Sequence, residues 1–128
     1  MSLFDASAII NLCGEKKLDK LLQGRTINLA FYEIGNAVWK QVHIHKKINS
    51  EEAKILLDPL LEIFSKLKKP EKENGLEALK IATGESITFY DASYIQAAIQ
   101  NNLTLITDDE QLYEKGKKYV KTLKTSEL

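Results

Sequence analysis

The sequence predicts an α/β fold in which a central, mainly parallel sheet is flanked by helices. Apolar runs typical of strands alternate with helical patterns along the chain, which favours parallel strands joined by helical crossovers. Four of these runs end at, or shortly before, a carboxylate. The length of 128 residues suits a single domain with one core. The runs cover residues 3–4, 27–30, 87–90 and 103–107, and the acids are Asp5, Glu33, Asp91 and the pair Asp108 and Asp109.

The composition is that of an ordinary globular domain, with 44% hydrophobic and 28% charged residues. Lys and Arg total 18, as do Asp and Glu, so any basic surface for a nucleic-acid partner must be local. The single cysteine, Cys13, excludes an internal disulfide and favours a cytoplasmic setting. The chain start lacks the pattern of a signal peptide, and no apolar run is long enough for a bilayer, so we expect no membrane association.

The first third of the chain predicts three helices. A short helix at 7–13 follows the first strand, and a second one covers residues 18–22, with Gly24 as its end. A strand is predicted at 26–30. From residue 31 to about 46 the pattern is helical, because Ile34, Val38 and Val42 recur every four residues.

The middle of the chain predicts a helix with an unusually long apolar stripe. Asn49 and the acids after it are typical of a helix start, and the stripe runs from residue 53 to 67. Pro59 predicts a kink or a break. We expect a helical hairpin insertion at about 31–68 within a single domain that covers 1–128. Its apolar stripe suits either ordinary core or a protein interface.

The last part of the chain returns to alternating elements. After a charged loop at 66–74, a helix at 75–83 is predicted with Leu76, Leu79 and Ala82 facing inward. A helix at 91–101 has Tyr94 and Ile95 on its inner face. An interior strand at 103–107, a short helix at 109–118 and an edge strand at 119–123 complete the prediction.

The acids predict a divalent-metal site. The carboxyl ends of parallel strands meet at one edge of a sheet, where ligands bind in open α/β folds. Carboxylates gathered there repel each other unless a cation lies among them. Oxygen ligands without a His or Cys cluster suit Mg²⁺ or Mn²⁺.

Each acid also has a purely structural explanation. Asp5 and Asp91 could cap helices, and Glu33 could complement a helix dipole. One of Asp108 and Asp109 is expected to cap the following helix. We favour Asp109 as the site residue and Asp108 as a cap or supporting group.

At these acids the chain resembles the PIN-domain ribonucleases, most closely the VapC-type toxins of toxin–antitoxin pairs. The matching segments come in the family's order and extend along nearly the whole chain. They are 3–7 (LFDAS), 32–37 (YEIGNA), 90–94 (YDASY) and 105–112 (LITDDEQL).

The resemblance implies a PIN-like three-layer domain and an Mg²⁺- or Mn²⁺-dependent endoribonuclease that cleaves single-stranded RNA. It also implies neutralisation by a cognate antitoxin. The positions of the family's four acidic residues, which are catalytic and metal-binding, fall on Asp5, Glu33, Asp91 and Asp109. Ser7 and Thr107 match its supporting hydroxyls.

As a hypothesis, Asp5 and Asp91 are the principal ligands, while Glu33 and Asp109 act directly or through metal-bound water. Cleavage would leave a 5′-phosphate and a 3′-hydroxyl. We expect a homodimer, with the apolar stripe receiving an antitoxin segment or a second copy, and Trp39 in the core or at the interface between copies. Candidate residues for a basic rim that guides RNA, each of which could equally be a solvated side chain, are Lys40, His43, His45, Lys46 and Lys47.

Two other classes of function remain open. The first is a non-catalytic protein-binding module that keeps the fold and its acids. The second is a phosphotransfer receiver or phosphatase on a similar α/β fold. That second class requires a Lys soon after a strand, and none closely follows residues 105–107.

Overall fold

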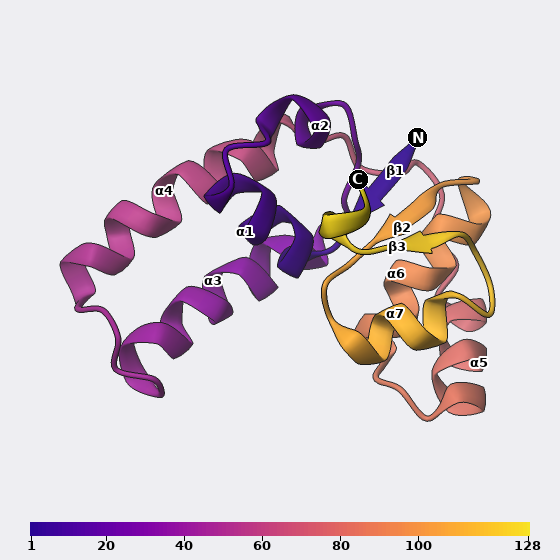
Figure 1. Ribbon diagram of the computed structural model, residues 1–128. Helices are drawn as coiled ribbons and strands as arrows, with labels where there is room; N and C mark the ends of the chain where they lie inside the picture. Colours follow the sequence, from indigo (N-terminus) through magenta and orange to yellow (C-terminus); the bar gives the residue numbers. More distant parts are fainter.

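The computed structural model covers residues 1–128 and has three short strands at the junction of two groups of helices (Figure 1). Helices α1 to α4 form one group, and α5 to α7 form the other. None of the helices combines the length and the apolar character needed to cross a membrane. In chain order the elements are β1 (Ser2–Phe4), α1 (Ala6–Gly14), α2 (Leu18–Leu22), α3 (Leu29–His43), α4 (Ser50–Lys66), α5 (Gly75–Glu85), α6 (Phe89–Gln100), β2 (Thr104–Ile106), α7 (Glu110–Gly116), β3 (Thr122–Leu123) and the 3₁₀ turn η1 (Thr125–Glu127).

The sheet is parallel throughout, as predicted, with the strand order β1-β2-β3. Leu3 lies opposite Leu105, and Phe4 lies opposite Ile106. Successive side chains of a strand point to opposite faces, so each of these pairs covers one face of the sheet. Strand β1, at the start of the chain, is thereby joined to a strand about a hundred residues later.

The two faces of the sheet carry separate halves of the core. Leu3 and Leu105 pack with buried residues of α5, α6 and α7. Phe4 and Ile106 pack with buried residues of α1, α3 and α4. The molecule therefore has three layers, with helices on both sides of the sheet, which confirms the predicted fold class.

Two of the five predicted strands are not strands. The segment at 26–30, predicted as a strand, leads into α3, which begins at Leu29. The segment at 87–90, also predicted as a strand, leads into α6, which begins at Phe89. Thr88 caps α6, since its hydroxyl accepts a hydrogen bond from the backbone N–H of Asp91 at 3.1 Å. Glu33 and Asp91 are therefore helical residues and do not follow strand ends. Glu33 lies in the second turn of α3, so it is not one of the first-turn acids that complement a helix dipole best.

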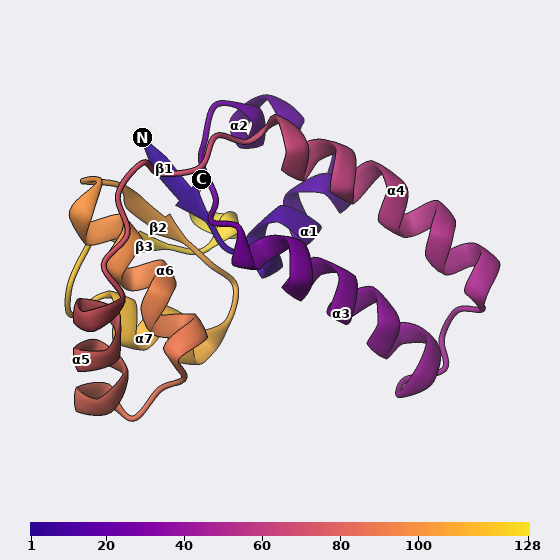
Figure 2. The ribbon, with the colours of Figure 1, turned by 180° about the vertical axis from the view of Figure 1, so that it is seen from behind.

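Helices α3 and α4 lie side by side and run in opposite directions (Figures 1 and 2). Asn49 begins α4 with a capping box, in which it and Glu52 exchange hydrogen bonds of 2.8 and 3.1 Å. The helix continues through Pro59, so the predicted break does not occur. Pro59 is exposed, and the carbonyl that it leaves without a helical donor can bond to water.

The inner face of α5 differs from the prediction. Ala78, Ile81 and Ala82 are buried, whereas Leu76 and Leu79 are 82% and 51% exposed. The buried residues follow the i, i+3, i+4 spacing of one helix face. The prediction was therefore right for Ala82 and wrong for both leucines, which lie on the neighbouring, exposed face of the helix.

Gly24 is required by close packing against β1. A Cβ atom at this position would lie 2.0 Å from a ring carbon of Phe4. Helix α2 itself ends at Leu22 and is capped by Gln23, so Gly24 lies just beyond the helix end that the sequence assigns to it. The glycine lets the chain after α2 pass directly over the Phe4 ring.

We predict that Gly24→Ala destabilises the protein by about 3 kcal/mol, because Phe4 is buried and cannot move away without disturbing the core. Equilibrium unfolding in urea measures the effect. The control is Gly84→Ala in α5, where a Cβ meets nothing within 4 Å. It should be neutral or stabilising by up to about 1 kcal/mol. Equal unfolding free energies for the two variants would contradict the prediction.

Candidate active site

Asp5 is the most firmly held of the four candidate acids. It directly follows β1, is only 5% exposed and caps α1. One carboxylate oxygen accepts hydrogen bonds from the N–H of Ala8 at 2.9 Å and the hydroxyl of Ser7 at 2.7 Å. The other accepts one from the hydroxyl of Thr107 at 2.5 Å. Burial, opposed by these hydrogen bonds, raises the pKa of Asp5 from 3.8 to about 6, and the nearby charge of Glu33 adds to the rise.

Ser7 and Thr107 join the two loops that follow β1 and β2. Besides bonding to Asp5, Ser7 accepts a hydrogen bond from the N–H of Asp108 at 3.0 Å. Thr107 accepts one from the N–H of Asp109 at 3.1 Å. These two hydroxyls therefore fix the distance between Asp5 and the Asp108–Asp109 segment.

Glu33 reaches the same region from the second turn of α3. It accepts a hydrogen bond of 2.7 Å from the hydroxyl of Tyr94, which is buried on α6. Partial burial raises the pKa of Glu33 despite this hydrogen bond, and the charge of Asp109 raises it further. Burial and the Glu33 carboxylate also raise the pKa of Tyr94, so its phenol stays protonated and donates a hydrogen bond to Glu33. Tyr94 thus holds Glu33 across the two groups of helices.

Asp91 lies in the first turn of α6 and is half-buried. No hydrogen bond contributes to its pKa, which rises from 3.8 to about 6 because of burial and the charges of Asp109 and Glu33. The cap of α6 is Thr88, so the purely structural explanation of Asp91 as a helix cap is wrong. Its carboxylate is charged, partly desolvated and free of structural hydrogen bonds.

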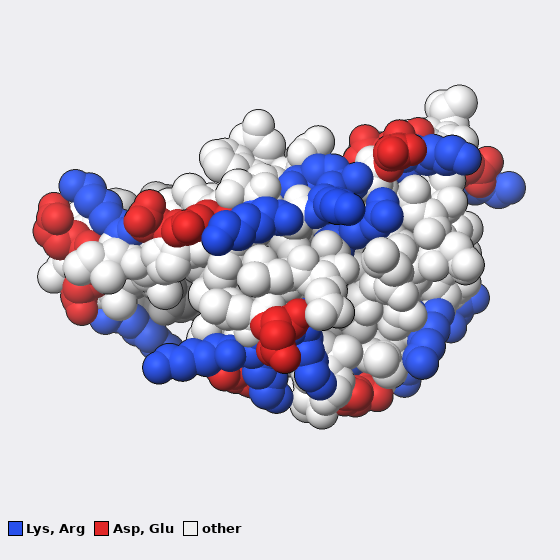
Figure 3. All heavy atoms as spheres, turned by 90° about the horizontal axis from the view of Figure 1, so that it is seen from above, with Lys and Arg blue, Asp and Glu red and all other residues white.

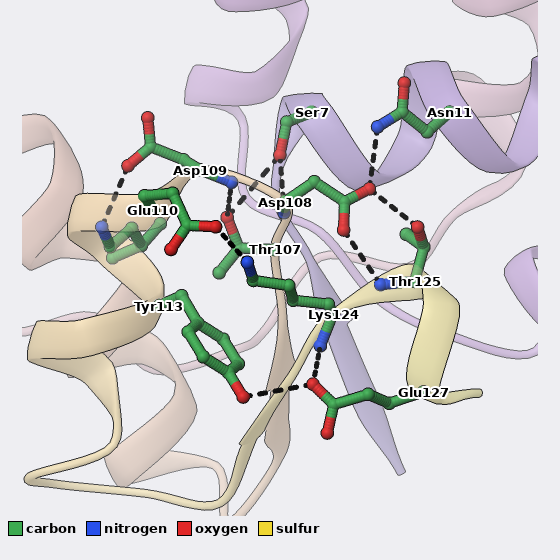
Figure 4. A network of polar contacts seen from close by, with 11 residues as sticks. Ser7, Asn11, Thr107, Asp108, Asp109, Glu110, Tyr113, Lys124, Thr125 and Glu127 are labelled. Carbon is green, nitrogen blue, oxygen red and sulfur yellow. Dashed lines mark hydrogen bonds and ion pairs between the residues drawn. The ribbon is translucent and has the colours of Figure 1, made fainter.

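The neighbouring acids Asp108 and Asp109 have different surroundings (Figure 4). Asp109 caps α7, where one oxygen accepts a hydrogen bond from the N–H of Leu112 at 2.8 Å. Asp108 accepts hydrogen bonds from Asn11 on α1 at 2.7 Å, and from the N–H and hydroxyl of Thr125 at 2.9 and 2.6 Å. The cap is therefore Asp109, not Asp108.

Asp108, in the loop after β2, links this loop to α1 and to η1 through its hydrogen bonds. Partial burial acts to raise its pKa, but the hydrogen bonds from Asn11 and Thr125 outweigh burial and leave the pKa below its usual value. Asp108 does not influence the pKa of Asp5, Glu33 or Asp91, whereas Asp109 influences the last two.

The four acids Asp5, Glu33, Asp91 and Asp109 form one electrostatic group. Glu33 raises the pKa of Asp5 and of Asp91, and Asp109 raises that of Glu33 and of Asp91. No Lys, Arg or His forms an ion pair with any of them. The structure therefore brings the four predicted residues together as an uncompensated negative charge.

The chemistry of this donor set fits a hard divalent cation, because such a cation would stabilise buried carboxylates and offset the repulsion that adds to the effect of burial on their pKa values. No group of three or more His, Cys, Asp and Glu side chains has the spacing to hold one ion jointly. Direct contact would then involve one or two carboxylates, with the others acting through water. Mg²⁺ commonly binds proteins in this way.

The predicted basic rim lies farther along α3. Lys40 follows Glu33 by seven residues, which is about 10 Å of helix, and His43 is the last helical residue. Trp39 is 48% exposed and stacks on His43 with ring centroids 5.3 Å apart. Trp39 is therefore not a core residue. The stack places an aromatic surface near the basic end of α3.

The family resemblance pointed to Ser7 and Thr107, which hold Asp5, but sequence reasoning missed the partners of Glu33 and Asp108. Tyr94 was assigned to the core, and its spacing of three residues from Asp91 was the signal that both lie on one side of α6. Asn11 and Thr125 gave no signal, since they meet Asp108 only through the tertiary fold.

The three-layer fold and the acidic group define a small α/β domain with a carboxylate centre at the end of its sheet. The chain belongs to the PIN domain family, whose pattern matches residues 3–118. The family resemblance given by the four sequence segments is thereby confirmed.

The relatives of the chain include two proteins of Pyrobaculum aerophilum. The chain is 34% identical over 119 residues to Exonuclease VapC9, covering 90% of this chain and 85% of that protein. It is 32% identical over 120 residues to Ribonuclease VapC3, covering 87% of this chain and 91% of that protein.

Solved structures show the same fold. The crystal structure of PAE2754 from Pyrobaculum aerophilum has a TM-score of 0.81 at 28% identity, over 98% of this chain and 91% of that chain. The structure of FitAcB from Neisseria gonorrhoeae has a TM-score of 0.66 at 19% identity over both complete chains. The second similarity concerns the fold alone.

We predict that Asp91→Asn stabilises the metal-free protein at neutral pH. The pKa of Asp91 is raised on folding, so its ionised form opposes folding above about pH 6 and the cost disappears below 3.8. A shift of this size would correspond to about 3 kcal/mol for a fully buried group, which solvent screening reduces to about 1 kcal/mol here. Thermal unfolding in EDTA should show a rise of about 4 °C in Tm.

The advantage of Asp91→Asn should grow as the pH rises from 4 to 7. Asp58→Asn, which removes an exposed carboxylate of α4, is the control and should leave Tm nearly unchanged. A lower Tm for Asp91→Asn at pH 7 would show that Asp91 is not under electrostatic strain.

Proposed function

We propose that this protein is a divalent-metal-dependent endoribonuclease that cleaves single-stranded RNA and acts as the toxin of a toxin–antitoxin pair. The observation that carries the proposal is the group of four carboxylates without a cationic partner, in which Glu33 acts on Asp5 and Asp91, and Asp109 acts on Glu33 and Asp91. A structural role does not explain why the carboxylate of Asp91 is partly desolvated beside two other acids. The names of its relatives, a ribonuclease and an exonuclease, support the same chemistry.

Asp5 and Asp91 would be the principal metal ligands, with Glu33 and Asp109 acting directly or through water. When bound, Mg²⁺ or Mn²⁺ would lower the pKa of a bound water and offset charge on the phosphoryl oxygens. Ser7 and Thr107 keep Asp5 in one position by their hydrogen bonds.

The other two acids are oriented by their partners. Tyr94 holds one oxygen of Glu33, and the N–H of Leu112 holds one oxygen of Asp109. Each carboxylate keeps a second oxygen that accepts no such bond. Those oxygens are suited to bind metal-bound water or to take a proton from the water that attacks the phosphodiester.

A non-catalytic PIN-fold protein-binding module is the alternative function. The observation that favours it is that no three acidic side chains are spaced to hold an ion together. The two functions differ in whether RNA is cleaved when Mn²⁺ is supplied.

We predict that the protein cleaves labelled single-stranded RNA with Mg²⁺ or Mn²⁺ and not in EDTA, leaving 5′-phosphate and 3′-hydroxyl ends. A circular single-stranded RNA should also be cut, because an endonuclease needs no chain end. Asp5→Asn and Asp91→Asn should each reduce the rate by at least about 10³-fold through loss of a ligand. Gel electrophoresis of the products measures the rates.

Asp58→Asn is the matched control and should keep full activity. Circular dichroism establishes that the variants are folded. A folded and fully active Asp91→Asn protein would remove this mechanism. A protein that cuts linear RNA and leaves the circle intact would be an exonuclease, and no cleavage of either RNA would favour the binding module.

We further propose a cytoplasmic protein with a cognate antitoxin and a homodimeric state. Part of the apolar stripe of α4 is core, since Leu60, Ile63 and Leu67 are buried. Ile55 and Leu56 of the same helix remain exposed, as do Leu76 and Leu79 of α5. Exposed apolar side chains of this number are suited to contact a protein partner.

We predict that light scattering coupled to size-exclusion chromatography gives twice the mass of one chain. Leu76→Lys with Leu79→Lys, and separately Ile55→Lys with Leu56→Lys, identify the face that forms the dimer. All four side chains are exposed, so both variants should fold. The variant of the contacting face should elute as a monomer. A wild-type protein of single-chain mass at all concentrations contradicts the homodimer.

A further inference from the structure

A basic cleft of about 630 Å³ lies at the end of the sheet away from the carboxylates. Four of its residues are cationic, and none is acidic. Its lining includes no aromatic ring. The cationic residues are Lys20 of α2, Arg25 of the following segment, Lys66 at the end of α4, and Lys68 beyond it.

The backbone forces two of these cations together. Arg25 pairs with Leu3 of β1 on one side and with Lys68 on the other, in parallel bridges. The N–H of Arg25 donates to the carbonyl of Ser2 at 2.9 Å, and the N–H of Thr26 donates to that of Lys68 at 3.1 Å. Side chains directly opposite across such a bridge lie on the same face, and like charges there repel. The backbone pairing of Arg25 with Lys68 thus places two like charges side by side, where an anion would offset their repulsion.

Arg25 also carries an unsatisfied donor. Its Nε atom is buried and has no hydrogen-bond partner in the chain. Buried donors of this kind are rare, because desolvation without a partner is costly. Neither Arg25 nor Lys20 nor Lys68 forms an ion pair with an acid, and Lys66 contacts only Glu62, at 3.6 Å on the surface. A phosphate group bound in the cleft would lie among these cations and offset the repulsion between them.

The cleft and the acidic group lie at opposite ends of β1. Ser2 lines the cleft, and Asp5 follows the other end of the strand three residues later, about 10 Å away along the backbone. Figure 3 views the molecule from the side of α2 and the chain start, and Lys and Arg side chains gather near the centre of this face. Acidic side chains lie to either side of that basic group.

We propose that this cleft binds backbone phosphates of the single-stranded RNA, as a subsite remote from the point of cleavage; the choice of RNA rests on the proposed function. The cations come from three separate segments and span more space than one phosphate group fills. Without an aromatic ring, the cleft offers no surface for base stacking, so it contacts the phosphates and reads no sequence. It holds the strand while the acidic end acts on another part of it.

Binding of a fluorescent oligouridylate of about 12 nucleotides, measured by anisotropy in EDTA, tests the proposal without cleavage. Lys20→Gln with Lys68→Gln should raise Kd about tenfold at about 50 mM salt and lower the salt slope of log K by about 1.4. The control, Lys80→Gln with Lys121→Gln, removes two exposed, unpaired lysines elsewhere and should change Kd less than about twofold. Lys20→Arg with Lys68→Arg should keep the affinity.

Nuclear magnetic resonance locates the contact. Oligouridylate should shift the amide signals of Gly24, Arg25 and Lys68 at concentrations far below those at which inorganic phosphate shifts them. Equal potency of phosphate and oligouridylate would mean a site for a small anion and would overturn the proposal. Equal losses in the Gln variant and its control, or no loss in either, would also overturn it.

The result of the oligouridylate-binding experiment can be told apart from the result of the nuclease assay. A protein that binds oligouridylate through the cleft and cleaves nothing with Mn²⁺ keeps the subsite and loses the proposed catalysis. A protein that cleaves RNA with unchanged affinity in the Lys20→Gln, Lys68→Gln variant keeps the catalysis and loses the subsite.

Discussion

The parallel pairing of β1 with β2 is the constraint on which the rest of the molecule depends. It joins the start of the chain to a segment about a hundred residues later, and each paired residue contributes to the core on one face of the sheet. The same pairing brings Asp5 against Thr107, whose hydroxyl bonds to the carboxylate. Helices α3 and α6 pack against the two faces of this short sheet. They contribute Glu33 and Asp91 to the acidic group. Packing of the core and assembly of the acidic group are thus consequences of one interaction.

Sequence alone was sufficient for the fold class and for β1 and β2, because alternation and short motifs are local properties. It was insufficient for the segments at 27–30 and 87–90, where a short apolar run is compatible with a strand or with the start of a buried helix. In the segment at 87–90, Thr88 caps α6 and so favours the helix over the strand. The hydrogen bonds of Asp108 and the Glu33–Tyr94 hydrogen bond join residues far apart in the chain, so no local pattern reveals them.

The charges of the molecule are separated, although its net charge is zero. Asp5 and its acidic neighbours lie at one end of β1, while the cleft lined by Arg25 and Lys68 includes Ser2 at its other end. Neither group neutralises the other, because a strand and its packed side chains lie between them. Each group is locally unfavourable, one through repulsion among carboxylates and the other through a buried unpaired donor and adjacent cations. Both are suited to ligands of the opposite charge.

Asp5 and Asp91 differ in their contribution to the stability of the fold, and this difference affects which mutations the chain tolerates over generations. Asp5 caps a helix and links two loops, so most replacements would weaken the fold and expose the protein to degradation. Asp91 has no such structural duty. A spontaneous mutation at codon 91 would therefore leave an intact fold. Substitutions should accumulate in folded protein at this position more readily than at Asp5.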